Sequence, residues 1–346
     1  MRVALDVTPA TTGRTGVARY ARELTRELRA LDIEVRPFAI GRGPYPAPDG
    51  TKRLRMPLRV VQQAWRIARH PTVEDIVGAV DVFHSLDLIP VPSRAPLVMT
   101  AHDTAAIERP DLHPPHQVAS QRHQLDGWRR AARVVAVSQA TADALARLGV
   151  DPARISVARH GLTPLPAAGP PVLEQPFLLA VGEVNARKDL PTLIAAFRQA
   201  DLPEDLLLVL AGPDGFRAEE TTRLTGGQVR ALGRVEDDVL GALYRDALAL
   251  CFPTLGEGFG LPVLEAMSAG KPLVVSDLDV LREVAEGAAL FVPPGDVTAW
   301  SGALERIVRD GELRTRLAEA GRQRAAAATW QATARDTVDA YRLALP

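Results

Sequence analysis

The 346-residue sequence lacks the features typical of secreted and membrane-spanning proteins, which are paired cysteines, a signal peptide and long apolar runs. It has a single cysteine, Cys251, so no disulfide can form within the chain, and the apolar run around it indicates a small buried side chain and not a nucleophile. No run of apolar residues approaches the roughly 20 that a transmembrane helix needs. Residues 1–7 have the pattern of a first strand and not of a signal peptide. We therefore expect a cytoplasmic protein.

The sequence also lacks an excess of either charge. Its 41 basic and 42 acidic residues leave a net charge of −1, which gives no reason to expect binding to nucleic acid. Lysine is scarce among the basic residues and occurs only at Lys52, Lys188 and Lys271. Hydrophobic residues make up 47% of the chain and charged residues 24%, as in ordinary globular proteins, and the length allows two domains with separate cores.

What the sequence does contain is a regular alternation of short apolar runs with helix-like segments, which is typical of parallel sheets covered on both faces. The runs occupy residues 3–7, 33–40, 80–84, 97–102, 134–138, 155–160, 177–182, 206–212, 229–233, 248–253, 273–276 and 290–293. A proline-rich connector at 163–171 divides them into two sets. We predict an α/β protein with two open sheets that bind ligands at the carboxyl ends of their strands.

The stretch Glu-Gly-Phe-Gly-Leu-Pro-Val-Leu-Glu at 257–265 predicts a phosphate site. Pro262 suits the first turn of a helix, where its missing N–H costs nothing, and Gly270 suits the end of that helix. Gly258 and Gly260 would let a bulky anion approach the backbone amides at the start of the helix, where the helix dipole adds a partial positive charge. We expect a phosphate or a sugar phosphate there.

Glu257 and Glu265 need a different partner, because a carboxylate repels a phosphate. One lies ahead of the helix and the other about one turn inside it, so both can accept hydrogen bonds from hydroxyls on either side of the phosphate. A ligand with hydroxyls flanking a diphosphate is a nucleotide sugar. Two glutamates alone would fit equally well with an acidic first turn that complements the dipole, and the glycines and Phe259 between them favour the ligand site.

Residues 251–296 resemble the signature of the family 4 retaining glycosyltransferases, which share the two-domain GT-B fold. Glu257 and Glu265 match the E-x7-E element, and the surrounding Phe-Pro, Leu-Glu-Ala-Met, Gly-Lys-Pro and Pro-Pro-Gly-Asp segments follow the family's order. The resemblance implies two Rossmann-like domains that face each other across a deep cleft. Residues 1–165 would form an acceptor domain and 166–330 a donor domain, and a last helix, 331–346, would cross back to the first domain.

In the donor domain the resemblance implies a clamp for the diphosphate at Arg187 and Lys188, two adjacent cations between a strand and a helix. Taken alone, such a pair is more often merely solvated. The backbone amides that would act with the clamp are those of Phe259, Gly260 and Leu261. Some members of the family carry a further arginine directly after the strand, where this chain has Glu183.

The resemblance assigns the other donor contacts to two side chains and one backbone segment. Glu257 would hold the sugar through its hydroxyls, and Glu265 would hold the ribose. The backbone at Arg234 or Val235 would read the edge of the base, which leaves almost no side-chain trace in the sequence.

One pattern points to a metal. Asp277 and Asp279 form an Asp-x-Asp motif, which holds a divalent ion in glycosyltransferases of the other common fold. Here the motif follows a short strand, where we expect Asp277 to cap a turn. Cationic side chains and a helix N-terminus would already neutralise the diphosphate, so we predict no metal and no cofactor.

Two residues of the acceptor domain complete the expected site. Gly16 lies in a loop similar to the family's Thr-Gly-Ile-Gly-Arg-Tyr element, with Ala18 in place of the second glycine, and an ordinary flexible turn is the alternative. His102 ends a strand and matches a family histidine beside the donor sugar, although a structural histidine bonded to a loop carbonyl fits the sequence as well. We expect His84 to be structural.

Residues 51–70 carry six cations and no acid, with apolar residues and Trp65 at roughly helical spacing. Such a basic amphipathic helix can lie on an anionic membrane surface, in which case the acceptor would be linked to a lipid. It would equally suit a surface helix packed on the sheet with a solvated basic face. Peripheral contact with the inner face of a membrane is therefore one of two hypotheses for this segment.

These observations predict a retaining glycosyltransferase, a hexosyltransferase that moves a sugar from a nucleoside diphosphate to the hydroxyl of a glycan, a lipid-linked or a small-molecule acceptor. GDP-mannose is the first expectation for the donor, because the Arg-Tyr and His-Asp elements look most like those of mannosyltransferase-type members. The alternatives are a nucleotide-sugar epimerase or phosphorylase of the same fold and a non-catalytic nucleotide-sugar-binding protein. A phosphorylase would need a lysine for pyridoxal phosphate, and Lys271 is poorly placed for that role.

Overall fold

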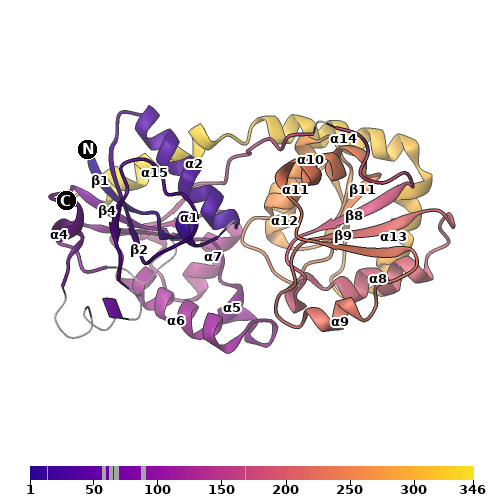
Figure 1. The fold of residues 1–346 in the computed structure, drawn as a ribbon, viewed down its shortest axis with the longest axis horizontal. Helices are drawn as coiled ribbons and strands as arrows, with labels where there is room; N and C mark the ends of the chain where they lie inside the picture. Colours follow the sequence, from indigo (N-terminus) through magenta and orange to yellow (C-terminus); the bar gives the residue numbers. More distant parts are fainter. Residues whose placement is uncertain (14, 57–59, 62–64, 66–69, 87–90, 168) are drawn as a thin grey trace. The chain divides into compact units, whose positions relative to one another are not determined.

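The computed structural model describes residues 1–13, 15–56, 60–61, 65, 70–86, 91–167 and 169–346 (Figure 1). The chain forms two compact units, each with its own sheet and core. The first unit consists of Met1–Ile107, His116–Gly161 and Thr329–Pro346. The second consists of Glu108–Pro115 and Leu162–Ala328.

The first unit contains a seven-stranded parallel sheet in the order β3-β2-β1-β4-β5-β6-β7. Its strands are β1 (Arg2–Asp6), β2 (Glu34–Ile40), β3 (Lys52–Leu54), β4 (Val82–Ser85), β5 (Leu97–Ala101), β6 (Arg133–Ala136) and β7 (Ile155–Val157). All the pairings are parallel, as expected for nearly continuous apolar strands buried on both faces. The strand order reverses between β1 and β4, which makes their carboxyl ends the switch point of this sheet.

The second unit contains a six-stranded parallel sheet in the order β10-β9-β8-β11-β12-β13. Its strands are β8 (Phe177–Val181), β9 (Leu207–Ala211), β10 (Val229–Gly233), β11 (Ala249–Phe252), β12 (Leu273–Ser276) and β13 (Ala289–Val292). Each lies within an apolar run of the sequence or within one residue of it. The order reverses between β8 and β11, so the segments that follow these two strands lie side by side at a switch point.

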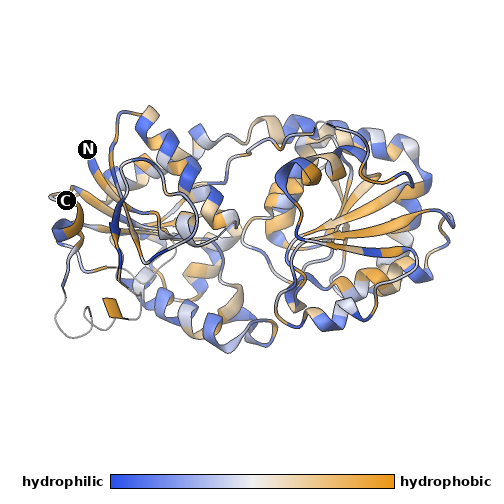
Figure 2. Ribbon diagram, viewed as in Figure 1, coloured by the Kyte–Doolittle hydropathy of each residue, from blue (hydrophilic) through white to orange (hydrophobic). Residues whose placement is uncertain are grey.

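Helices cover both sheets (Figure 1), the strands are mostly hydrophobic in the colouring of Figure 2, and the side chains that the helices bury are mainly apolar. Those of the first half of the chain are α1 (Thr8–Thr12), α2 (Gly16–Ala30), α4 (Val73–Val77), α5 (Ala105–Glu108), α6 (Pro115–Arg130) and α7 (Gln139–Arg147). The later ones are α8 (Leu190–Gln199), α9 (Ala218–Thr222), α10 (Asp237–Asp246), α11 (Leu261–Ser268), α12 (Asp279–Ala285), α13 (Val297–Arg309), α14 (Gly311–Ala326) and α15 (Trp330–Ala344). The described residues also form the short 3-10 helices η1 (Pro110–Leu112), η2 (Pro152–Arg154) and η3 (Ala186–Lys188).

Each unit has its own apolar core. In the first, Leu5 and Leu24 pack with Tyr341 of α15, a helix that belongs to this unit although it comes last in the chain. In the second, Leu178 packs with Trp300 and with Cys251, whose thiol pKa is raised by burial. Cys251 is thus the buried small side chain that the sequence indicates.

Residues 51–70 match the expected amphipathic helix only in part, because Val60, Val61 and Trp65 are helical but the segment begins with a strand. Lys52–Leu54 is the edge strand β3, because its backbone pairs with β2, and an edge tolerates the exposed cation Lys52. Trp65 is only 8% exposed, packs in the core with Val61 and donates its Nε1–H to the carbonyl oxygen of Pro71 at 3.1 Å. A tryptophan held in this way cannot anchor the segment in a bilayer. Residues 57–59, 62–64 and 66–69 lie outside the described residues.

Among the described helices, none combines the length and the apolar character that crossing a bilayer requires.

Candidate active site

The switch point of the second sheet brings together two segments that are far apart in the sequence. The segment after β8 carries η3, which contains Arg187 and Lys188, and the segment after β11 carries Glu257. Because β8 and β11 are neighbours, both segments start at the same edge of the sheet. Three of the four residues that we expected to be catalytic therefore meet there.

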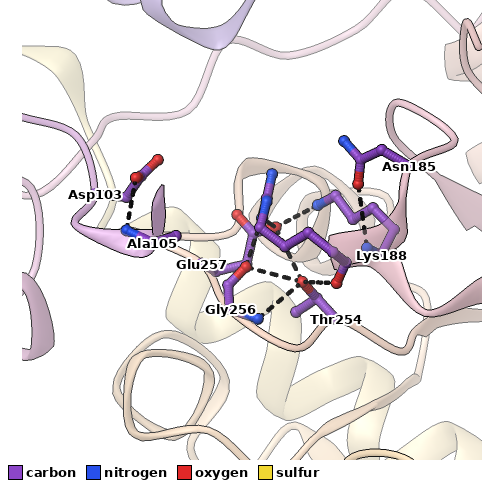
Figure 3. Close-up of polar contacts among 8 residues, drawn as sticks. Asp103, Ala105, Asn185, Lys188, Thr254, Gly256 and Glu257 are labelled. Carbon is purple, nitrogen blue, oxygen red and sulfur yellow. Dashed lines mark hydrogen bonds and ion pairs between the residues drawn. The ribbon is translucent and has the colours of Figure 1, made fainter. Parts of the chain in front are cut away.

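Glu257 forms ion pairs with both cations (Figure 3). Arg187 Nη1 lies 2.5 Å from Oε1 of Glu257 and 2.5 Å from the carbonyl oxygen of Gly256, and the ammonium of Lys188 donates to the same Oε1. The exposed fractions of the three side chains are only 18% for Arg187, 10% for Lys188 and 12% for Glu257. The sequence predicted these residues one by one, and the structure joins them into one nearly buried cluster.

Burial and charge compete for the protonation states of this cluster. Burial alone would raise the pKa of Glu257, but Arg187 and Lys188 outweigh it and lower that pKa to about 2. Burial lowers the pKa of Lys188 to about 8, although the attraction of Glu257 opposes the shift. Near neutral pH the cluster thus holds two cations and one carboxylate, an excess of one positive charge suited to a diphosphate.

The two oxygens of Glu257 have different surroundings. All the hydrogen bonds found for this side chain in the described part of the chain fall on Oε1. Oε2 remains available to accept a hydrogen bond from a ligand hydroxyl. Oε1 therefore holds the carboxylate in place, and Oε2 can bind a sugar hydroxyl.

Thr254 and Asn185 position this cluster, and the sequence analysis missed both. Thr254 is fully buried, and its hydroxyl lies 2.9 Å from the carbonyl oxygen of Gly256, 3.3 Å from that of Arg187 and 3.4 Å from Glu257 Oε1 (Figure 3). The side-chain oxygen of Asn185 accepts from the backbone N–H of Lys188 at 3.2 Å. The asparagine is a recognisable cap before a helical turn, whereas nothing local in the sequence marks the threonine.

Gly182 and the ring of Phe252 lie against the Lys188 side chain. A Cβ at Gly182, where φ is 137°, would lie 3.1 Å from Lys188 Cε, closer than ordinary van der Waals contact. Lys188 Nζ lies 4.1 Å from the centre of the Phe252 ring, in a cation–π arrangement. A small pocket beside the lysine is lined by apolar residues that include Ala180, Phe252 and Cys251.

Helix α11 begins as the sequence predicted. Gly260 precedes it with φ 95° and ψ 54°, Pro262 lies in its first turn, and Gly270 follows it with φ 67°. No side chain caps α11 in the described chain, and the backbone N–H of Val263 in its first turn donates to the carbonyl oxygen of Gly260 at 2.9 Å. The ring of Phe259 is 6% exposed and anchors this loop in the apolar interior.

Glu265 and Val235 lie on elements of the same unit. Glu265 is 8% exposed in α11, and Tyr244 of α10 donates its hydroxyl to Oε2 of this glutamate at 3.0 Å. Val235 is half-buried in the loop after β10. Strand β9 lies between β10 and β8, and because the strands are parallel, Val235 and Lys188 follow their strands at the same end of the sheet. Tyr244 orients the carboxylate of Glu265, a contact that only the packing of two helices reveals.

In the first unit, His102 follows β5 and makes the loop contact that the sequence left open. Its Nε2–H donates to the carbonyl oxygen of Leu86 at 2.9 Å, and its ring stacks on that of His160 at 5.7 Å. Asp103 accepts from the backbone N–H of Ala105 at 3.0 Å (Figure 3). Because a carbonyl can only accept, Nε2 carries the proton of His102, and in the neutral ring Nδ1 is an acceptor.

The other two residues considered in the first unit have simpler surroundings. Gly16 is the exposed first residue of α2, and the Thr15 side chain caps that helix by accepting from Ala18 N–H at 3.2 Å. His84 is fully buried, with its ring nitrogens 2.7 Å from the Tyr341 hydroxyl and 2.8 Å from that of Thr100. This environment fits the structural role expected of His84.

The Asp-x-Asp pair takes part in a surface ion pair and a helix start. Arg282 Nη2 donates to Asp277 Oδ2 at 2.7 Å, and Asp279 is the first residue of α12. Asp277 is thus bonded to a guanidinium that would compete with a cation for its carboxylate.

Two family models cover most of the chain. Residues 14–164 match the model described as Glycosyltransferase Family 4, and residues 165–324 match that of Glycosyl transferases group 1. The chain belongs to glycosyltransferase family 4. The family match establishes this protein as a glycosyltransferase, and the cluster at Glu257 lies within the group 1 region.

This family 4 glycosyltransferase is similar to several characterised proteins. The O-antigen chain mannosyltransferase B of Escherichia coli is 29% identical over 266 residues, which are 71% of this chain and 70% of that protein. The D-inositol 3-phosphate glycosyltransferase of Salinispora tropica is 30% identical over 285 residues, which are 71% of this chain but 58% of that protein. Part of each relative therefore has no counterpart in the aligned region.

Solved structures identify the fold of this glycosyltransferase as GT-B, which confirms the predicted fold class. The sucrose-phosphate synthase of Thermosynechococcus elongatus superposes with a TM-score of 0.77 at 22% identity, over 99% of this chain and 98% of that one. Anabaena HepE in complex with UDP and glucose has a TM-score of 0.74 at 16% identity, over 98% of both chains.

Proposed function

We propose that this glycosyltransferase transfers a hexose from a nucleoside diphosphate to a hydroxyl acceptor with retention of configuration. The second unit would bind the donor and the first unit the acceptor. The observation that carries the proposal is the nearly buried cluster of Arg187, Lys188 and Glu257 at the switch point of the second sheet. It combines an excess positive charge for a diphosphate with a carboxylate oxygen for a sugar hydroxyl.

The main chemical difficulty is the negative charge that develops on the departing diphosphate. Arg187 and Lys188 would stabilise it together with the amides of Phe259, Gly260 and Leu261 at the start of α11. Since all these groups are held in place before the reaction, they need little reorganisation when the charge appears, and this kind of preorganised electrostatic stabilisation is usually the largest contribution to catalysis.

The remaining expected residues would orient the substrates. Glu257 would hold the hexose through Oε2, and Glu265, already oriented by Tyr244, would hold the ribose. The backbone at Val235 would meet the base. His102 of the first unit would support the sugar, and Gly16 of the same unit would let a ligand approach closely, because glycine has no side chain.

We propose that the acceptor oxygen attacks the anomeric carbon on the face from which the diphosphate leaves, so that the configuration is retained. The bond from the anomeric carbon to the diphosphate oxygen breaks, and the bond from that carbon to the acceptor oxygen forms on the same face. A leaving phosphate oxygen takes the acceptor proton. A double displacement would need an enzymic nucleophile, and the carboxylate nearest to the proposed sugar site, Glu257, is already paired with two cations.

The similarity to O-antigen chain mannosyltransferase B supports GDP-mannose as the first donor to test. The similarity to a D-inositol 3-phosphate glycosyltransferase supports a small-molecule acceptor as one choice beside a glycan or a lipid-linked one. Peripheral contact with the inner face of a membrane through residues 51–70 remains part of the proposal. It would depend on exposed cations such as Lys52 and Arg55, because Trp65 lies in the core.

The test is incubation with a panel of GDP, UDP and ADP sugars, with slow donor hydrolysis and its products as the readout. We expect one sugar nucleotide to release free hexose, and Glu257→Gln to lower the rate by about 100-fold or more. Glu174→Gln, which removes an exposed carboxylate from the same unit, is the matched control and should leave the rate unchanged.

The alternatives predict other products. An epimer of the donor would indicate an epimerase, and a sugar phosphate formed from added phosphate would indicate a phosphorylase. Binding of a nucleotide sugar without any turnover, across a broad set of acceptors, would indicate a non-catalytic protein and contradict the proposal.

A further inference from the structure

The near-neutral charge of the whole chain hides a strong difference between its two units. The residues of the first unit include 24 arginines and lysines and 16 aspartates and glutamates, a net charge of +8. Those of the second unit include 17 and 26, a net charge of −9. The proposed acceptor unit is therefore strongly basic, which favours an anionic ligand.

Part of this positive charge lies at the carboxyl ends of the edge strand β3 and of its neighbour β2. Residues 40–56, all of which the structure describes, include four basic residues and one acid, Asp49. The register pairs Ile40 with Leu54, and the Gly41 N–H donates to the carbonyl oxygen of Leu54 at 2.9 Å. Arg55 directly follows Leu54, and Arg42 follows Gly41, so the two arginines leave neighbouring strands at the same end of the sheet.

Neither of these two arginines is used to hold the fold. Both are exposed, and among the described residues neither Arg42 nor Arg55 makes a hydrogen bond or an ion pair. Most other arginines of this unit are engaged, as Arg53 shows by donating to the carbonyl oxygens of Gly43 at 3.2 Å and Tyr45 at 3.0 Å. Two cations that leave neighbouring strands at the same end of the sheet, neither paired with an acid in the described part of the chain, repel each other, and an anion bound by both would offset that repulsion.

Hydrogen bonds and close packing hold the loop that carries Arg42 in place. Besides the two bonds from Arg53, the N–H of Tyr45 donates to the carbonyl oxygen of Thr11 at 3.2 Å. Gly43 packs so closely on α1 that a Cβ there would lie 2.0 Å from the same carbonyl oxygen. Alternating prolines at 44, 46 and 48 restrict the loop further. A loop held in this way presents its arginine with little entropy left to lose on binding.

We infer that Arg42 and Arg55 form a subsite for a phosphate-type anion carried by the acceptor. The inference rests on the proposed function, because it assigns the acceptor to the first unit. The subsite lies at the same sheet edge as α1 and the Gly16 loop, which follow β1, the strand next to β2. The anion could belong to a soluble phosphomonoester or to a lipid headgroup. Met56, which follows Arg55 and is 41% exposed, would suit the apolar part of a lipid.

The experiment compares wild type with the double variant Arg42→Gln/Arg55→Gln. The matched control is Arg122→Gln/Arg130→Gln, which removes two exposed arginines of α6 in the same unit and changes the net charge equally. UDP and GDP are present at saturation to fill the donor site. Glycerol 1-phosphate and glycerol are titrated calorimetrically, and vesicles of phosphatidylcholine with and without phosphatidate are used for co-sedimentation.

We expect wild type and the control to bind a phosphate probe and not its neutral counterpart, and the double variant to bind it about tenfold or more weakly. Binding of both glycerol 1-phosphate and phosphatidate vesicles would identify the phosphate group itself as the ligand, and binding of the vesicles alone would identify a lipid-borne anion. Equal affinity in the double variant and the control, or no binding of either probe by wild type, would overturn the inference.

Donor hydrolysis, measured on the same samples, separates this inference from the proposed function. If all variants hydrolyse the donor but the double variant binds phosphate as tightly as the control, the proposed function stands and the subsite is ruled out. Loss of phosphate binding in the double variant, with no donor hydrolysis even in wild type, would support the subsite and contradict the proposed function.

Discussion

At the scale of single residues, a rise in pH can remove the charge of Lys188. Burial lowers the pKa of Lys188 to about 8, so in the ligand-free enzyme the ammonium loses its proton from about pH 8 upward. Because the proposed clamp needs this charge, we expect kcat/KM for the donor to fall above that pH. The measurement is a pH profile of donor hydrolysis at low donor concentration.

Lys188→Arg provides the control for this profile, since a guanidinium stays charged throughout the accessible range. The variant should lose some rate at neutral pH, because the compact site beside Gly182 and Phe252 fits an ammonium, but its alkaline limb should move to higher pH. An unchanged alkaline limb would mean that a different group titrates.

Stability should respond to pH in the opposite direction from activity. The pKa of Lys188 is lower in the folded state than its ordinary value of 10.5, so between pH 8 and 10.5 the unfolded chain binds more protons and this residue's contribution to stability rises with pH. For Glu257 the pKa is about 2 against an ordinary 4.5. Its stabilising contribution is fully present above pH 4.5 and is lost as the pH falls toward 2.

At the scale of elements, the start of α11 depends on one backbone conformation. Gly260 has φ 95°, and a Cβ there would also lie 3.0 Å from Leu281 Cδ2. Gly260→Ala should therefore cost about 1–2 kcal/mol in backbone strain and move the amides that face the proposed diphosphate. We expect a lower melting temperature and a Kd for UDP or GDP raised by about tenfold.

Gly287→Ala is a matched control for that prediction. Gly287 also has a positive φ, 75°, but no atom lies within 4 Å of the position that a Cβ would take. The control should lose similar stability to backbone strain while nucleotide affinity stays unchanged. If both variants weakened nucleotide binding equally, the effect would come from general destabilisation and not from the helix start.

At the scale of the whole molecule, the chain returns to its first unit with α15, and buried polar contacts hold that helix there. The Tyr341 hydroxyl of α15 lies 2.7 Å from His84 Nδ1, and both residues are fully buried. Removing the hydroxyl leaves a buried ring nitrogen without its partner, so Tyr341→Phe should cost about 1–3 kcal/mol. Denaturant unfolding should show the loss in the first unit.

Nucleotide affinity is the readout that separates the two units in this variant. Because the proposed donor site lies in the second unit, Tyr341→Phe should leave the Kd for UDP and GDP unchanged. Weaker nucleotide binding with an unchanged unfolding midpoint would contradict the view that α15 serves the first unit.

Much of the fold could be predicted because apolar strand periodicity is a local property. Val229–Gly233 and Leu273–Ser276 have the bounds that their apolar runs indicated, and the glycine and proline signals placed α11 correctly. The three-residue strand Lys52–Leu54 was missed, because its strand conformation comes from pairing with β2 and its cations resemble a helix face. For Trp65 the sequence left two hypotheses open, and its burial in the core favours a helix packed on the sheet, since only packing shows which side of a segment is covered.

The amino-acid sequence by itself determined the α/β class, the family and the residues that can carry charge, since these follow from patterns within short stretches. Only the tertiary structure decided that Arg187 and Lys188 share one carboxylate oxygen of Glu257, about 70 residues further along the chain. The order of the strands sets that meeting, because β8 and β11 become neighbours only when the sheet forms. Burial then decides the charge of Lys188, and burial is a property of the folded chain.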